Sequence, residues 1–258
     1  MKICEAEWKE AGEMSETWNP WHGCKRISSG CLSCPVYQKD YRYGRNPSLV
    51  FRTKAFDLPV QKNRTHTFRL SPEDHLVKTC TTSDFFIEEA DAWRSEAWRY
   101  IHSRPDLDFL IITKRPERIA QALPSDWDDG YENVSIGVSV ESQYNADRRI
   151  RLLLSLPVRK LSVAVEPMLG PVHLSRYLAT GKIDSVSCGG ESGPYVRICD
   201  FAWVLDLMLE CVRYGVPFRY TQTGGRLKKG DQIYNIGEEY QITQAEKAGI
   251  NFGEVIAV

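Results

Sequence analysis

Short apolar runs alternate with amphipathic stretches along most of the chain. The runs, taken together with the small and polar residues that end them, occupy residues 75–84, 107–115, 133–142, 160–170, 183–193 and 217–225. Runs this short, rich in Val and Ile, are typical of buried parallel strands. A further strand is predicted around Thr17–Trp21.

The stretches between the runs predict helices. Apolar side chains between Ile87 and Ile101 follow three- and four-residue spacing. Asp200 is expected to cap a later helix that Gly215 ends. Alternation of strand and helix favours an α/β fold with right-handed crossovers. We expect a (β/α) barrel or a partial TIM-like barrel, and the alternative is an open, doubly wound sheet.

The length of 258 residues suits one such barrel, which takes about 250 residues. We expect residues 1–225 to form this domain, with a cysteine loop at 18–37, and residues 226–258 to form a small C-terminal extension. No apolar run approaches the ~20 residues that span a bilayer, and the N-terminus lacks the apolar core of a secretory signal. These features predict a cytoplasmic protein without a membrane helix.

Charge is nearly balanced, with 33 Lys and Arg against 34 Asp and Glu. A net charge of -1 argues against an overall basic coat for nucleic acid. The stretch at 61–69, with Arg52 and Lys54 before it, is nevertheless basic and contains Phe68. Such a stretch suits a nucleotide or nucleic-acid substrate, and it is equally compatible with a solvated loop.

Polar residues stand at the end of nearly every predicted strand. In this fold class ligands bind at the carboxyl ends of the strands. The residues are Ser83, Asp84, Lys114, Arg115, Glu141, Ser142, Glu166, Glu191, Ser192 and Gln222. Three carboxylates at close range would raise at least one pKa and suit acid–base work, unless each pairs with Lys114, Arg115 or Arg197. Gly189 and Gly190 are compatible with a cradle for a cofactor or with a simple tight turn.

Three of the eight cysteines are clustered, as Cys24-x6-Cys31-x2-Cys34. Cysteines of a cytosolic protein are reduced, and this spacing indicates a metal site. One interpretation adds His22 as the fourth ligand of a structural zinc. The other places a [4Fe–4S] cluster on the three cysteines, with one iron left open. An open iron is what radical S-adenosylmethionine chemistry requires.

The sequence resembles the phage-type three-cysteine-motif proteins, a family of uncharacterised proteins found in phages, prophages and bacteria. The matching stretches are TWNPWHGCKRISSGCLSC at 17–34, TSDFF at 82–86, LIITKRPERI at 110–119, IGVSVESQYNADRRIRLLLSLP at 136–157, VEPMLGPV at 165–172, GGESGP at 189–194 and PFRYTQTGG at 217–225. The resemblance implies a barrel distantly similar to radical S-adenosylmethionine enzymes, with an iron–sulfur cluster on the three cysteines.

The chain departs from those patterns in three places. The first cysteine gap holds six residues where radical enzymes usually have three, Pro35 follows the last cysteine where an aromatic residue is usual, and Thr221 stands where a Lys usually precedes Gln222. In radical enzymes a Gly-Gly-Glu motif after an early strand binds the cofactor. Asp84 is our candidate for the acid at that early position.

These patterns predict an iron–sulfur enzyme of radical S-adenosylmethionine type that takes electrons from an external donor. The predicted metal ligands are Cys24, Cys31 and Cys34, the catalytic residues are Glu141, Glu166, Lys114 and Arg115, and the cofactor-binding residues are Asp84, Gly189, Gly190, Glu191, Ser192 and Gln222. The alternative is a non-redox binding protein with a structural zinc.

Overall fold

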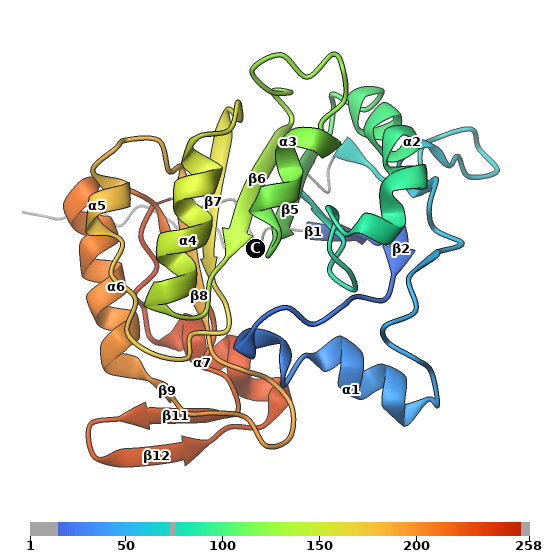
Figure 1. Cartoon of the computed structure of the whole chain (residues 1–258). Helices are drawn as coiled ribbons and strands as arrows, with labels where there is room; N and C mark the ends of the chain where they lie inside the picture. Colours follow the sequence, from blue (N-terminus) through green and yellow to red (C-terminus); the bar gives the residue numbers. More distant parts are fainter. Residues whose placement is uncertain (1–14, 73–75, 254–258) are drawn as a thin grey trace, which may run out of the picture.

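Seven parallel strands form one curled sheet, a half-barrel (Figure 1). The computed structural model describes residues 15–72 and 76–253. The strands of the sheet, in spatial order, are β1 (Ser15–Trp18), β4 (Leu76–Thr79), β5 (Asp108–Thr113), β6 (Val134–Ser139), β7 (Lys160–Val165), β8 (Ser185–Gly189) and β10 (Phe218–Gln222). All seven predicted strands are therefore confirmed. β1 and β10 are the two edges, so the described strands form the partial barrel and not a closed one.

Helices connect successive strands. They are α2 (Asp91–His102), α3 (Ile119–Ala122), α4 (Gln143–Leu154), α5 (Ser175–Leu178) and α6 (Phe201–Tyr214). The predicted ends of α6 are confirmed, because the Asp200 side chain accepts a hydrogen bond from the Ala202 N–H and Gly215 has a left-handed φ of 66°. Glycine takes that conformation without the steric cost that a Cβ brings.

The two faces of the sheet differ in chemistry. Alternate residues of each strand point to opposite faces. One face presents large apolar side chains such as Phe109, Ile136 and Val163, which join the helices in the main hydrophobic core. At the centre of the other face the residues are small, and all but one are serines: Ser135, Gly137, Ser139, Ser162, Ser185 and Ser187. The helices thus cover the apolar face. The concave face is polar at its centre and carries a small apolar cluster of Leu76, Leu110 and Ile112 towards β4.

Two smaller sheets extend this core. β2 (Trp21–His22) pairs antiparallel with β3 (Phe51–Arg52), next to α1 (Pro35–Arg42). Near the C-terminus, β11 (Arg226–Lys229) and β12 (Gln232–Asn235) form a hairpin, and β11 also pairs with β9 (Cys199–Asp200). Helix α7 (Gln241–Lys247) follows the hairpin and contacts β10. The division of the chain at residue 225 stays a prediction.

Among the residues that the structure describes, no helix is both long enough and apolar enough to cross a membrane.

Candidate functional site

The three clustered cysteines lie on one loop between β2 and α1. Gly23 begins this loop with a φ of 91°, and a Cβ there would collide with the Leu49 carbonyl, so the position requires glycine. A short 3-10 helix, η1 (Ser29–Cys31), follows, and Cys34 is the N-cap of α1. All three thiols are free and half-buried. Figure 1 shows the loop, in blue, beyond the carboxyl ends of β5 and β6.

The three cysteines line a single pocket of about 190 Å³. The other lining residues come from the loop, the start of α1, the segment after β4 and the carboxyl ends of β5 and β6. They are Lys25, Val36, Thr81, Thr82, Ser83, Asp84, Ile112, Thr113, Lys114, Arg115 and Ser139. The predicted metal ligands thus meet the predicted strand-end residues Asp84, Lys114 and Arg115. The pocket lies at the edge of the sheet where this fold class binds its ligands.

Two cations stand beside two of the thiols. Lys114 Nζ lies 3.9 Å from Cys31 Sγ, and Arg115 Nη1 lies 3.7 Å from Cys24 Sγ. Burial tends to raise the pKa of Cys31, but the charge of Lys114 and contacts with Ile27 and Ser28 outweigh burial and leave the pKa lowered. Burial raises the pKa of Cys24 to about 11 against the opposing effect of Arg115. The pocket therefore contains positive charge next to its sulfur atoms.

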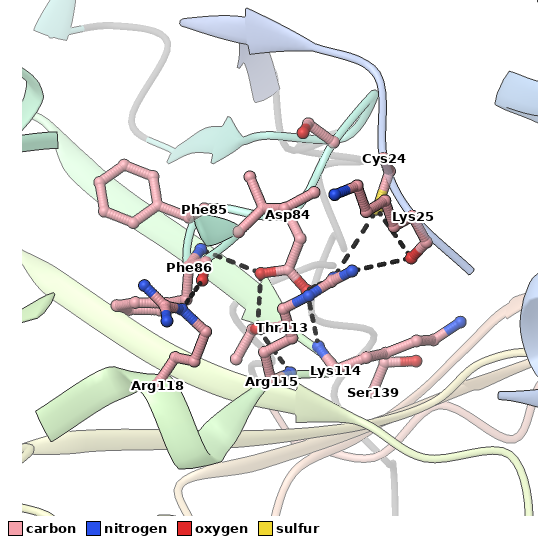
Figure 2. Close-up of polar contacts among 12 residues, drawn as sticks. Cys24, Lys25, Asp84, Phe85, Phe86, Thr113, Lys114, Arg115, Arg118 and Ser139 are labelled. Carbon is pink, nitrogen blue, oxygen red and sulfur yellow. Dashed lines mark hydrogen bonds and ion pairs between the residues drawn. The ribbon is translucent and has the colours of Figure 1, made fainter. Parts of the chain in front are cut away.

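The Asp84 carboxylate is fixed by hydrogen bonds from neighbouring protein groups (Figure 2). Its carboxylate accepts hydrogen bonds from Thr113 Oγ1 at 2.7 Å, from the N–H groups of Phe86 and Lys114 at 2.9 and 3.1 Å, and from Arg115 Nη1 at 2.9 Å. Arg115 in turn donates through Nη2 to the carbonyl of Lys25 at 2.7 Å. The Asp84–Arg115 pair therefore connects the ends of two strands to the cysteine loop.

Glu141 contacts the same loop from the end of β6. Its fully buried carboxylate accepts from the Gly30 N–H at 3.4 Å, from Asn145 Nδ2 at 2.9 Å and from Arg149 Nη1 at 2.8 Å. Burial acts to raise the pKa of Glu141, but hydrogen bonds and the charges of Arg149 and Lys114 leave the pKa lowered. Glu141 is thus an ionised anchor for η1.

Glu191 acts on the loop through Arg197. The Glu191 carboxylate accepts from the Arg197 N–H and Nε, each at 2.9 Å, and forms an ion pair with Nη2 of that arginine. Arg197 Nη2 also donates to the Ser29 carbonyl at 2.9 Å. Two of the three predicted ring carboxylates therefore pair with arginines: Glu191 with Arg197, one of the partners expected from the sequence, and Glu141 with Arg149, which was not among them.

Glu166 differs from the other two carboxylates. It is half-buried, accepts a hydrogen bond from Thr221 Oγ1 at 3.1 Å, and makes no ion pair with a described residue. Burial raises the pKa of Glu166, against the opposing effects of the Thr221 hydroxyl and of the charges of Lys78 and Lys114. Ser139, which lines the cysteine pocket, donates to the Glu166 carbonyl at 2.7 Å. Glu166 is therefore a carboxyl group suited to hold a proton beside the pocket.

The remaining predicted cofactor-binding residues bind one another at the ends of β8 and β10. Gln222 Nε2 donates to the Gly190 carbonyl at 2.9 Å, and Ser192 Oγ donates to Gln222 Oε1 at 3.0 Å. A Cβ on Gly190 would collide with the Thr223 carbonyl, so this glycine allows two chain segments to pack closely. Neither Gly189 nor Gly190 lines the cysteine pocket. Close packing against Thr223 therefore explains Gly190, and cofactor binding by the glycine pair stays a prediction.

His22 lies outside the cysteine pocket. Its Nε2 is 2.8 Å from Asp40 Oδ2, and its ring packs against Phe51 at 5.4 Å between centroids. Within residues 15–72 and 76–253, no three His, Cys, Asp or Glu side chains are arranged to hold a single metal ion.

Sequence reasoning missed several residues of the site. Arg149 was not named, although it lies on α4 only eight residues after Glu141, which precedes the N-cap of that helix. Thr82 was also missed: its Oγ1 is buried without a hydrogen-bond partner in the lining of the cysteine pocket. A buried hydroxyl without a protein partner is rare, and in this pocket it is available to water or to a bound ligand.

Comparison with known proteins gives one match. No curated protein and no solved structure matches the chain. The family described as "Protein of unknown function (DUF5131)" matches residues 5–252. Because that match covers nearly the whole chain, the protein belongs to this family.

Proposed function

We propose that Cys24, Cys31 and Cys34 hold a [4Fe–4S] cluster and that the protein is an enzyme of radical S-adenosylmethionine type. One observation carries the proposal: three free thiols from a single loop line one pocket at the carboxyl ends of parallel strands. Enzymes with this fold class place their reactive groups there. The proposal includes a TIM-like, radical-enzyme-like half-barrel, a cytoplasmic location and the phage association implied by the resemblance.

The donor set suits such a cluster. Iron–sulfur clusters are bound by thiolates and carry negative charge, which Lys114 and Arg115 are placed to offset. Four further cysteines, Cys80, Cys188, Cys199 and Cys211, are buried and do not line the pocket. Cys4 lies outside the described residues. Three thiolates in the described part of the pocket leave one iron for an external ligand.

The same geometry weakens the zinc alternative. A tetrahedral zinc site needs four ligands, and His22 was the fourth. In the structure its imidazole is engaged by Asp40 and stacks on Phe51, away from the cysteine pocket. The zinc alternative therefore lacks its fourth ligand among the described residues.

The residues around the cysteine pocket have different proposed roles. Asp84, Arg115, Glu141 and Arg197 fix the cysteine loop, and Lys114 adds positive charge at the sulfur atoms. The Thr82 hydroxyl is free to bind a ligand in the pocket, and Glu166 is the candidate to hold or donate a proton. When bound, S-adenosylmethionine would supply one-electron chemistry with electrons from an external donor, and the substrate class we propose is a nucleotide or nucleic acid.

Anaerobic purification tests this proposal directly. The expected product is a brown protein with about four iron and four sulfide per chain, the content of one [4Fe–4S] cluster. It should form 5′-deoxyadenosine when dithionite and S-adenosylmethionine are added. Cys31→Ser should abolish iron binding, whereas the matched control Cys199→Ser, at a buried cysteine outside the pocket, should keep it. A colourless protein with one zinc per chain would refute the proposal.

A further inference from the structure

The charge of the protein is unevenly distributed along the chain. Residues 25–69 contain ten Lys and Arg against two Asp and no Glu, whereas the rest of the chain has 23 Lys and Arg against 32 Asp and Glu. One of the two acids, Asp40, is buried against His22. The near-zero net charge therefore conceals a strongly basic segment that carries the cysteine loop and α1.

A groove runs along the exposed face of α1. Two adjacent cavities, of about 190 and 470 Å³, share the lining residues Gly193, Pro194 and Glu238, and we call the two together the α1 groove. On its α1 side are Pro35, Gln38, Lys39 and Arg42, which the three- and four-residue helical spacing places on one face. On the other side are the segment after β8 and the β11–β12 hairpin (Figure 1).

The groove combines cations with exposed aromatic rings. Lys39, Arg42 and Arg226 are exposed and make no ion pair with a described residue, and Glu238 is the one carboxylate among the described lining residues. Tyr43 is 62% exposed and Tyr195 is 99% exposed. Tyr195 also has a left-handed φ of 58°, which costs a residue with a Cβ free energy. The fold thus holds a large ring in water at this point.

We propose that the α1 groove binds single-stranded nucleic acid, with Tyr43 and Tyr195 stacking on bases and Lys39, Arg42 and Arg226 contacting phosphates. Aromatic rings that stack on exposed bases, in a groove whose cations follow the backbone, are how proteins bind single strands. In a duplex the bases are stacked on one another, so no free base face is available for the tyrosine rings. An acidic protein segment would account for the cations but not for a fully exposed tyrosine.

The groove and the cysteine pocket are lined by neighbouring residues of one segment, although no described residue lines both. Cys34 and Val36 line the pocket, and Pro35 between them lines the groove. A strand in the groove would therefore lie next to the segment that carries the proposed cluster ligands. This inference deepens the substrate class of the proposed function, but binding itself requires no cluster chemistry, so a binding assay can fail or succeed independently of the iron assay.

Fluorescence anisotropy with the full-length chain tests the inference. The probe is a labelled oligonucleotide of about 16 nucleotides, as DNA and as RNA, since such surfaces cover ~4–16 nucleotides. We expect the single strand to bind more tightly than its own duplex. Tyr195→Ala and Tyr43→Ala should each raise Kd roughly fivefold or more, the cost of one lost stacking contact. Both rings are largely exposed, so these variants should fold.

Charge variants provide the second arm. Lys39→Gln with Arg42→Gln should reduce the slope of log K against log salt by roughly 1.4, because each phosphate contact to a single strand contributes about 0.7. Lys182→Gln with Arg213→Gln removes the same charge from exposed positions outside the groove and should leave Kd and slope unchanged. Equal effects of the two pairs, equal affinity for duplex, competition by poly-glutamate as strong as by oligonucleotide, or no binding at all would overturn the proposal.

Discussion

The carboxylate of Glu141 accepts a hydrogen bond from the backbone N–H of Gly30, which precedes it by 111 positions in the sequence. Gly30 is followed directly by Cys31, so this contact fixes the second thiol relative to the end of β6. The carboxylate is fully buried and is neutralised by Arg149. The Glu141–Arg149 ion pair therefore fixes the carboxylate, and the carboxylate in turn fixes the cysteine loop.

Glu141→Gln should destabilise the protein and lower its iron content. The change leaves Arg149 buried without a counter-charge, which typically costs about 3–5 kcal/mol. The measurement is the free energy of unfolding in urea, together with iron per chain after reconstitution. Glu132→Gln is the matched control, since that carboxylate pairs with Arg159 at the surface and should cost at most about 1 kcal/mol. Equal losses for the two variants would contradict the anchoring role.

Gly30→Ala should also disturb the loop. A Cβ at Gly30 would stand 3.2 Å from three side-chain carbon atoms of Glu141, which Asn145 and Arg149 hold in place. Overpacking of this kind usually costs about 1–3 kcal/mol. Gly170→Ala is the control, because nothing lies within 4 Å of its added Cβ. Thermal unfolding and iron content should change for Gly30→Ala only; an unchanged Gly30→Ala protein would show that the loop adapts freely.

Asp84→Asn distinguishes two roles of this residue. If Asp84 anchors the loop, as its four hydrogen bonds indicate, the variant should lose about 3 kcal/mol or more of stability and part of its iron. The affinity of the iron-loaded fraction for S-adenosylmethionine should stay unchanged. Glu89→Gln, which removes an exposed ion pair with Lys25 of the same loop, serves as the control. A stable, fully loaded Asp84→Asn protein with weakened cofactor binding would instead support the direct cofactor contact expected from the sequence.

Glu166 should impose a pH dependence on stability. Burial raises the pKa of Glu166 in the folded protein, so ionisation is less favourable there than in the unfolded chain. The stabilising contribution of the protonated form is complete below the unfolded pKa and is lost as pH rises through the folded pKa. Glu166→Gln removes this loss. The stability of the variant relative to wild type should therefore increase as pH rises above the unfolded pKa of a glutamate, as measured by urea unfolding. A parallel pH profile of the two proteins would refute the raised pKa.

The alternation of short apolar runs and helical stretches was sufficient to predict the seven strands of the sheet. It could not decide whether the sheet closes, because closure depends on how the edge strands meet and not on the periodicity of either. The cysteine loop and the residues near it were also predictable, since strand ends share one edge of a parallel sheet. Asp84, Lys114 and Arg115 line the pocket for that reason.

The roles of the strand-end residues were harder to predict. Glu141 and Glu191 were expected in a ring of carboxylates, but Arg149 and Arg197 neutralise them. Pairing depends on which side chains meet in space, and Arg149 comes from a helix whose sequence shows only amphipathic spacing. Gly190 illustrates the same limit, because its close neighbour Thr223 is distant in sequence.

Most contacts that hold the cysteine loop are made to its backbone. Ser83 donates to the Gly23 carbonyl, Arg115 to that of Lys25, Arg197 to that of Ser29, and Glu141 accepts from the Gly30 N–H. Carbonyl and amide groups are the same whatever side chain they bear. These contacts therefore depend on the length of the loop and not on its exposed side chains. Substitutions at Arg26 or Ile27 should be tolerated, whereas deletion of a single residue between Cys24 and Cys31 should not be.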